Sequence, residues 1–279
     1  MRRILTAAVL IPAIVALVLW GPFYILIAVG LLITEAALWE FFRLAEHSGR
    51  SVFRVPGYIL GGAIALQSFF SQAGPLRRSL SPWEILLIMP MALFAWAMLS
   101  RRNLDNFFES VSATLLGLAY VAVPLSLLVY LIPLGHNSAR LVLFGLVVIW
   151  AADSTAFFVG RYWGRHKIAP RISPGKSWEG TAASLAAALL AGLLFAHFFW
   201  NSIGRLPSSE SNYLEVGILA LVVNVAGQAG DLAESALKRN AGVKDSSQLV
   251  PGHGGVLDRI DALLFAAPVL WYYWIWRLS

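Results

Sequence analysis

Long apolar runs separated by short polar segments are the main pattern along this chain. A helix needs about 20 apolar residues to cross the hydrocarbon core of a bilayer. The stretches that fit run over 4–20, 22–42, 57–73, 83–99, 111–133, 140–160, 178–200, 213–235 and 258–276. These unbroken runs differ from the short alternating strands of a transmembrane β-barrel. The pattern predicts an all-α, polytopic integral membrane protein with about nine transmembrane helices.

The composition excludes several classes of protein. Hydrophobic residues make up 58% of the chain and charged residues 13%, with a mean hydropathy of +0.71. Soluble domains average about 45–50% apolar and about 25% charged residues. A soluble globular protein, a disordered chain and a coiled coil are therefore excluded. The chain has no cysteine, which excludes thiol catalysis and Cys-ligated zinc.

The basic residues predict the orientation in the membrane. If the N-terminus is cytoplasmic, 16 of the 21 Lys and Arg residues fall in inner segments and 5 in outer ones. Because cytoplasmic loops carry the excess of Lys and Arg, the N-terminus is predicted inside and the C-terminus outside. In this setting the net charge of +6 suits anionic lipid headgroups, and we expect no nucleic-acid partner.

No repeat, linker or low-complexity segment divides the chain, so we expect a single membrane-embedded domain over 1–279. Two predicted cytoplasmic segments, 161–177 and 236–257, are rich in Gly, Pro, Ser and basic residues. Loops held by a rigid scaffold are where chemistry is usually found. We therefore expect the N-terminal helices, about 1–135, to be scaffold and about 140–279 to carry the active site.

The eighth apolar stretch ends in a polar helical face. Asp231, Glu234, Ser235 and Lys238 fall at i, i+3, i+4 and i+7, which places them on one side of a helix. A charge at membrane depth costs about 2.5–3.5 kcal/mol on insertion scales. A charge at this depth therefore needs a functional or structural explanation. For Lys238 two explanations stay open: it contacts a phosphate, or it forms a salt bridge at the membrane interface with its ammonium reaching the headgroups.

Asp258 and Asp261 are spaced i, i+3 at the start of the ninth stretch. The helix dipole alone would explain either carboxylate. It does not explain three carboxylates, with Asp231, among nearby basic residues. Those basic residues are Lys238, Arg239, Lys244 and Arg259. Oxygen ligands suit a hard divalent cation such as Mg²⁺, and basic residues around it suit a polyphosphate substrate.

Two loop motifs have the composition of anion sites. The segment 251–255, PGHGG, lets the backbone approach a ligand, and His253 either contacts a phosphate or holds the loop to a helix end. In the segment 173–177, Ser177 can cap the following helix and Lys176 can contact a phosphate. The Gly-Lys-Ser triplet is not a P-loop, because Pro170 occupies the position of the first glycine and no strand is expected before it.

Residues 235–261 resemble the signature of the phosphatidate cytidylyltransferases, also called CDP-diacylglycerol synthases. The pattern of that family runs S-x-x-K-R, then K-D, then H-G-G, and ends in D-R-x-D. The positions in register are Ser235, Lys238, Arg239, Lys244, Asp245, His253, Gly254, Gly255, Asp258, Arg259 and Asp261. Residues 153–180 are similar to a second family segment, Ser-Pro-x-Lys-Ser-x-Glu-Gly after a span, although the family commonly has Lys where Gly175 stands.

The resemblance implies that CTP and phosphatidate react to give CDP-diacylglycerol and pyrophosphate. It implies catalytic roles for Asp231, Lys238, Asp258 and Asp261, with the three aspartates as Mg²⁺ ligands. The substrate-binding residues that it implies are Ser173, Lys176, Ser177, Ser235, Arg239, Lys244, His253, Gly254, Gly255 and Arg259. It also implies a bacterial cytoplasmic (inner) membrane protein, with membrane lipids as partners and the active site facing the cytoplasm.

Other functions stay open. One alternative is another CTP-dependent membrane lipid transferase, or a polyprenol kinase. Another is a cation-coupled transporter that uses Asp153 and Asp231 as intramembrane ion ligands. The transporter is disfavoured because the acidic residues gather toward one membrane face and no inverted repeat is visible. The sequence leaves open whether the protein forms a homo-oligomer.

Overall fold

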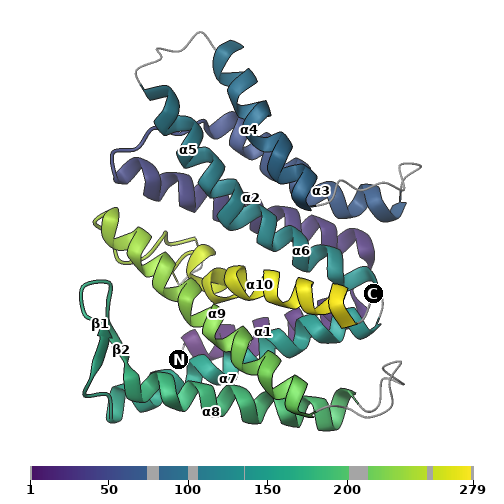
Figure 1. The fold of residues 1–279 in the computed structure, drawn as a ribbon, viewed down its shortest axis with the longest axis vertical. Helices are drawn as coiled ribbons and strands as arrows, with labels where there is room; N and C mark the ends of the chain where they lie inside the picture. The colour runs from purple at the N-terminus through teal and green to yellow at the C-terminus, as the bar shows by residue number, and fades with distance from the viewer. Residues whose placement is uncertain are drawn as a thin grey trace. The chain divides into compact units, whose positions relative to one another are not determined.

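The computed structural model describes residues 2–73, 82–99, 106–134, 136–200, 213–249 and 254–277, which are mostly helical (Figure 1). Contacts divide the chain into two compact units. The first unit comprises Met1–Tyr130 and Leu237–Ile260, and the second comprises Leu131–Ala236 and Asp261–Ser279. The expectation of a single domain with an N-terminal scaffold stays a prediction.

The first unit is built around α2. Its N-terminal elements are α1 (Arg2–Trp20), α2 (Phe23–His47), α3 (Arg54–Ala73), α4 (Pro82–Leu99), α5 (Phe107–Gly117) and α6 (Val123–Leu131). Ala37, Leu38 and Phe42 on α2 are fully buried and form the centre of the core. A π-helical turn at Leu118–Ala122 joins α5 to α6. Pro124 follows that turn, where it has no N–H to donate to the carbonyl four residues earlier.

The second unit is formed by long helices and one small hairpin. Its elements are α7 (His136–Tyr162), β1 (Lys167–Ala169), β2 (Ser173–Ser177), α8 (Trp178–Phe195), most of α9 (Tyr213–Asn240) and most of α10 (Leu257–Arg277). Helices α7 and α8 pack against each other, and the hairpin connects them at one end (Figure 1). Phe144, Ala220 and Leu270 are buried in its core. Gly192 of α8 faces Phe144 of α7 and Ala220 of α9, and Gly145 of α7 faces Leu270 of α10.

The helices have the length and surface of membrane-spanning segments. Each of the nine apolar stretches of the sequence falls in a helical segment. Five helical segments among the described residues are long and apolar enough to cross a membrane. These are Phe23–His47, Phe107–Leu134, Asn137–Tyr162, Trp178–Phe199 and Tyr213–Asn240. Large apolar side chains such as Leu32, Leu190 and Val225 are exposed on these helices, as a lipid-facing surface requires. The chain is thus an α-helical, multi-pass membrane protein.

One part of the predicted all-α architecture is corrected by the structure. The segment 161–177 was expected to be an irregular loop without a strand, but it contains the antiparallel pair β1–β2, with Lys167 opposite Ser177 and Ala169 opposite Ser173. The Ile172 N–H donates to the Ala169 carbonyl at 3.1 Å and closes the turn. Pro170 follows Ala169 in this turn, a position where its restricted φ is favoured. A strand of three residues is too short for hydrophobic periodicity to reveal.

Candidate active site

A lysine–carboxylate pair forms the centre of the polar cluster in the second unit. Lys176, near the end of β2, donates from Nζ to Asp231 Oδ2 of α9 at 2.8 Å. The same ammonium donates to the Gln228 carbonyl oxygen at 3.1 Å. Asp153 of α7 interacts electrostatically with both members of the pair. A lysine implied as a phosphate ligand and a carboxylate implied as a metal ligand therefore neutralise each other here.

The hairpin is held in place by the first turn of α8. The Ser177 side chain is buried and accepts a hydrogen bond from the Gly180 N–H at 3.2 Å, so the predicted helix cap is confirmed. Glu179 accepts from the His166 ring at 2.6 Å and from the His166 backbone N–H at 3.2 Å. These contacts tie the end of β2 and the residue before β1 to the start of α8.

Neutral polar side chains join α8 to α9 behind Lys176. Thr181 donates to the Gln228 side-chain oxygen at 2.9 Å, and the Gln228 amide donates to Ser184 Oγ at 2.8 Å. The Asn224 amide donates to the same Ser184 oxygen at 3.2 Å. Buried polar groups need such partners, above all in an apolar surrounding. The network fixes the turn of α9 that presents Gln228 and Asp231 to Lys176.

Asp231 and Asp261, both in the second unit, come from segments that pack in close contact. A Cβ added at Gly230 would lie 2.3 Å from the Asp261 carbonyl oxygen, so only glycine allows this approach of α9 and α10. Asp261 Oδ1 accepts from the Ala262 N–H at 2.8 Å. Asp231 Oδ1 accepts from Ser235 Oγ at 3.4 Å, and the Asp231 side chain remains 39% exposed. Two of the three predicted metal ligands are thereby brought together at the backbone level.

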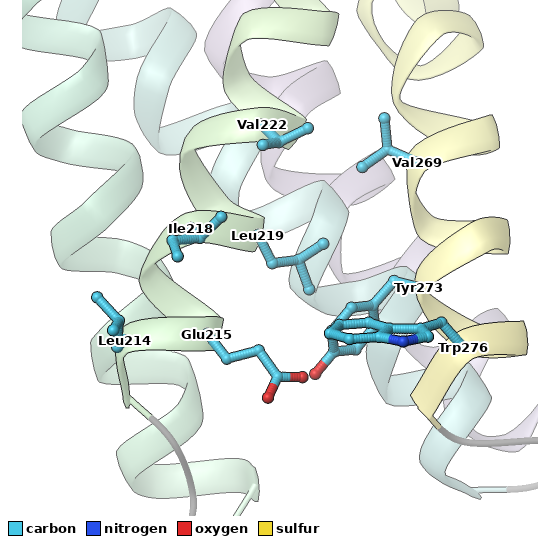
Figure 2. A pocket seen from close by; sticks show the side chains of 8 residues that line it. All are labelled: Leu214, Glu215, Ile218, Leu219, Val222, Val269, Tyr273 and Trp276. Carbon is cyan, nitrogen blue, oxygen red and sulfur yellow. The ribbon is translucent and has the colours of Figure 1, made fainter.

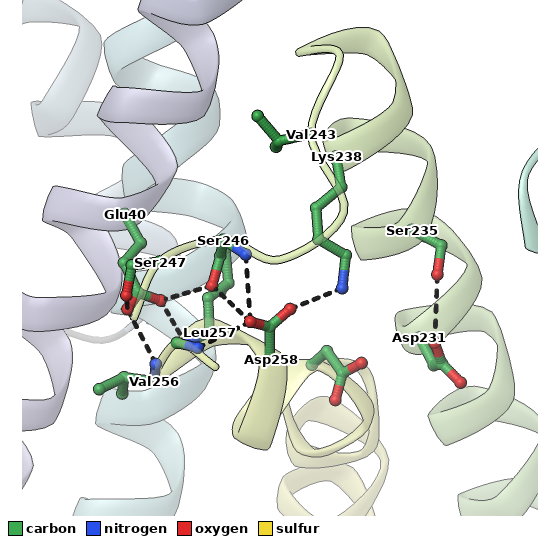
Figure 3. Close-up of polar contacts among 12 residues, drawn as sticks. Glu40, Asp231, Ser235, Lys238, Val243, Ser246, Ser247, Val256, Leu257 and Asp258 are labelled. Atoms are coloured by element: carbon green, nitrogen blue, oxygen red, sulfur yellow. Dashed lines mark hydrogen bonds and ion pairs between the residues drawn. The ribbon is translucent and has the colours of Figure 1, made fainter. Parts of the chain in front are cut away.

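The third predicted metal ligand, Asp258, lies in the first unit and has several hydrogen-bond donors (Figure 3). Its Oδ1 accepts from Lys238 Nζ at 2.6 Å. Its Oδ2 accepts from the Ser246 N–H at 3.1 Å, from Ser246 Oγ at 2.9 Å and from the Gly255 N–H at 2.8 Å. The side chain is only 7% exposed. Asp258 therefore organises the segment between α9 and α10 as well as pairing with Lys238.

Glu40 of α2 holds the same segment from the other side (Figure 3). Oε1 accepts from Ser247 Oγ at 2.5 Å and from the Val256 N–H at 2.9 Å. Oε2 accepts from Ser246 Oγ at 2.9 Å and from the Leu257 N–H at 2.6 Å. The residue is 0% exposed. A carboxylate at this position satisfies two of the first N–H groups of α10, which have no partner within the helix.

The two glycines of the predicted anion-binding loop fit against these carboxylates. Gly254 has a φ of +81°, and an added Cβ would lie 2.8 Å from Asp258 Oδ2. A Cβ added at Gly255 would lie 1.9 Å from Ser246 Oγ and 2.6 Å from both Glu40 oxygens. The sequence predicted that the backbone of this loop would closely approach a ligand. In the structure it closely approaches the side chains of Asp258, Ser246 and Glu40 instead. His253 lies outside the described residues, so both of its predicted roles stay predictions.

Comparison with known proteins identifies the family of this chain. The family model described as "Cytidylyltransferase family" matches residues 1–276. The chain belongs to this family. A Haemophilus influenzae protein named phosphatidate cytidylyltransferase is 35% identical over 292 aligned residues, which cover 99% of each chain. A Bacillus subtilis protein of the same name is 34% identical over 277 residues, covering 97% of this chain and 96% of the relative. A Brucella abortus protein, also so named, is 44% identical over 154 residues, 55% of this chain and 53% of the relative.

The remaining signature residues of this cytidylyltransferase-family chain differ in exposure. Lys244 and Arg259 are exposed, and Arg239 donates to the Val243 carbonyl at 3.2 Å from an exposed position. Ser235 is buried beside Asp231, and Ser173 is half-buried in the hairpin. Lys244, Arg239 and Arg259 thus lie at the surface of the protein. The substrate contacts implied for all of these residues stay predictions.

Several residues that shape the site were missed in the sequence. Glu40, Ser246 and Ser247 were not assigned roles, although they hold the signature segment together. A carboxylate inside an apolar stretch was a usable signal for Glu40, because a charge at membrane depth needs a partner. Gln228 and Thr181 gave no comparable signal, because neutral polar side chains are common in membrane helices.

A groove of about 400 Å³ runs between α9 and α10 elsewhere in the second unit (Figure 2). Its lining is mainly apolar, including Leu219, Val222 and Trp276. At its polar end Glu215 accepts two hydrogen bonds from Arg277, at 2.7 and 2.6 Å, and a further one from Tyr273. None of the predicted site residues lines it, so it is separate from the polar clusters described above.

Proposed function

We propose that this protein transfers the cytidylyl group of CTP to phosphatidate, giving CDP-diacylglycerol and pyrophosphate. The observation that carries the proposal is the near full-length similarity to enzymes named phosphatidate cytidylyltransferase. The family model over residues 1–276 and the signature at 235–261 support it. The protein is accordingly a nucleotidyltransferase of phospholipid biosynthesis.

The reaction requires charge neutralisation and alignment. An oxygen of the phosphatidate phosphate attacks the α-phosphorus of CTP, and the bond from that phosphorus to the bridging oxygen of pyrophosphate breaks. Such transfers depend mainly on positioning and electrostatic stabilisation. Lys176 and Lys238 supply ammonium groups for phosphate oxygens, supported by the exposed Arg239, Lys244 and Arg259. We propose direct transfer, without a covalent enzyme intermediate.

Mg²⁺ is the proposed cofactor, held by Asp231, Asp258 and Asp261. Carboxylate oxygens are suitable ligands, and Mg²⁺ is usually bound by one or two carboxylates together with substrate phosphates and water. Among the described residues, no three acidic or imidazole side chains lie close enough to hold a metal ion together, so at most two of the three aspartates would bind the ion in this arrangement. When bound, the ion would neutralise negative charge on the phosphates.

The three aspartates differ in how accessible their carboxylates are to Mg²⁺. Asp231 is the most open, with its side chain 39% exposed and one lysine as partner. Asp261 packs against the residue before Asp231. Asp258 has hydrogen-bond donors at both oxygens and must exchange at least one of them to bind a cation. Its part in the proposal rests on the signature.

We further propose nine membrane crossings with the N-terminus in the cytoplasm and the C-terminus outside, in the bacterial inner membrane. The 16-to-5 distribution of basic residues supports this orientation. It places the segments 161–177 and 236–257 at the cytoplasmic face, where CTP is available. The acyl chains of phosphatidate would remain among the membrane lipids.

The decisive experiment incubates the purified protein with labelled CTP, phosphatidate and Mg²⁺ and identifies the products. Formation of CDP-diacylglycerol with an equal amount of pyrophosphate supports the proposal. A phosphorylated polyprenol formed in a parallel reaction, with no CDP-diacylglycerol, would instead identify the kinase alternative. No turnover with either lipid would favour a transporter or a non-catalytic role.

A further inference from the structure

Glu40 is an unusual residue to find within the largely apolar helix α2. It is completely buried, and its hydrogen-bond partners lie more than 200 positions later in the chain. An isolated buried carboxylate is strongly unfavourable, so its hydrogen bonds must compensate for the lost hydration. The four donors, two at each oxygen, are two serine hydroxyls and two backbone N–H groups.

The donor set explains why an acid occupies this position. An ionised carboxylate accepts at both oxygens, whereas a glutamine accepts at one and donates from its nitrogen. The serine hydroxyls could rotate to accept from an amide. The N–H groups of Val256 and Leu257 can only donate, and each is directed at a different oxygen. An uncharged amide would therefore leave one of them facing another donor.

A single hydroxyl links Glu40 to the signature residues. Ser246 Oγ lies 2.9 Å from Glu40 Oε2 and 2.9 Å from Asp258 Oδ2. Because a hydroxyl has one proton, it is shared between the two carboxylates. Asp258 in turn accepts from Lys238 at 2.6 Å. The position of the Asp258–Lys238 pair thus depends on where Glu40 holds Ser246 and the start of α10.

We infer that Glu40 is a positioning residue for cytidylyl transfer. Because Glu40 is completely buried, a substrate cannot contact it in this arrangement. By binding Ser246, Ser247 and the first residues of α10, it holds the segment that carries Asp258 and Lys238 in one conformation. The inference rests on the proposed function, because the two signature residues are given their roles by that reaction.

The test compares Glu40→Gln with the matched control Glu46→Gln. Glu46 lies on the same helix but is exposed and pairs with Arg54, away from the signature segment. Because the chain has no cysteine, Gln248→Cys gives a single exposed attachment site for a spin label in that segment. Turnover per folded molecule and label mobility are then measured in labelled protein, in detergent below the thermal midpoint.

We expect Glu40→Gln to lower kcat at least about tenfold and to raise the mobility of the label, because a buried charge-assisted hydrogen bond is lost. The KM for phosphatidate should stay within about twofold, since the buried Glu40 is not accessible to the lipid. Glu46→Gln should match the wild type in both measurements. A residue that only stabilised the fold would change the thermal midpoint but not the kcat of molecules that remain folded.

The inference is overturned if folded Glu40→Gln keeps the wild-type kcat and label mobility. If that variant does not fold, Ser247→Ala serves as the test. It removes one hydrogen-bond donor to Glu40 and leaves the Glu40 carboxylate with its other three donors. It should lower kcat and loosen the label by smaller amounts, and wild-type values for both would overturn the inference. Failure of the wild type itself to form CDP-diacylglycerol would instead refute the proposed function, on which the inference depends.

Discussion

Gly255→Ala is the substitution whose effect the structure defines most sharply. The added Cβ would lie 1.9 Å from Ser246 Oγ and 2.6 Å from each carboxylate oxygen of Glu40. Both neighbours are buried. Neither can move freely, because Glu40 is held by four donors and Ser246 lies between two carboxylates. Relief of the clash must therefore break hydrogen bonds or displace the backbone before α10.

The expected loss of stability combines two effects. Overpacking a filled site costs about 1–3 kcal/mol. Losing a hydrogen bond to a charged group costs about 1.5–3 kcal/mol. Together these predict a loss of about 2.5–6 kcal/mol, provided that one hydrogen bond to Glu40 is broken. For a chain of this size that corresponds to a fall in the thermal midpoint of at least about 5 °C.

The measurement is thermal unfolding in detergent, followed by the fluorescence of the 11 tryptophans, with turnover measured alongside. Gly175→Ala is the matched control, because no heavy atom lies within 4 Å of the Cβ it would add. Its midpoint should stay within about 1 °C of the wild type, as for ordinary surface substitutions. If Gly255→Ala unfolds at the wild-type temperature, Ser246 and Glu40 do not enclose this backbone, and the reasoning fails.

Two other predictions concern the proposed metal ligands and the topology. Asp231→Asn and Asp258→Asn should each lower turnover at least about 10²-fold across a Mg²⁺ titration, with the double variant little worse than the worse single one. Asp258→Asn should also lower the thermal midpoint by more than Asp231→Asn does, because the Asp258 side chain is 7% exposed and the Asp231 side chain is 39% exposed. Near wild-type turnover at low Mg²⁺ in both folded variants would refute the metal assignment. A cysteine at the exposed position Gln248 should resist an impermeant thiol reagent in intact cells and react once the cells are opened, and labelling of intact cells would contradict the orientation.

Helix positions were predictable from the sequence because long apolar runs have few alternative structures in a membrane. All nine runs lie in helical segments, and the Ser177 cap was visible in the local residue pattern. The hairpin at Lys167–Ser177 was not, because its strands are too short for periodicity to indicate. Family membership followed from the spacing of the signature residues in one segment.

The partners of the site residues were much harder to predict than the residues themselves. Asp258 was recognisable from the signature, but its bonds to Ser246 and Gly255 depend on how one segment folds back on itself. The contact of Glu40 with Leu257 joins positions 217 residues apart. Periodicity and spacing contain no information about such a pairing. The only local indication was the charge itself, within an apolar run.

The two lysine–carboxylate pairs constrain how the proposed reaction can begin. Lys176 pairs with Asp231 at 2.8 Å and Lys238 pairs with Asp258 at 2.6 Å, each within one unit. Bound Mg²⁺ and nucleotide phosphates would give all four groups new partners, so binding exchanges ionic contacts more than it adds them. The affinity gained is then a difference between two sets of contacts and depends on geometry. For the same reason, removing one member of a pair leaves the other uncompensated, and its effect includes that penalty as well as the lost contact with substrate.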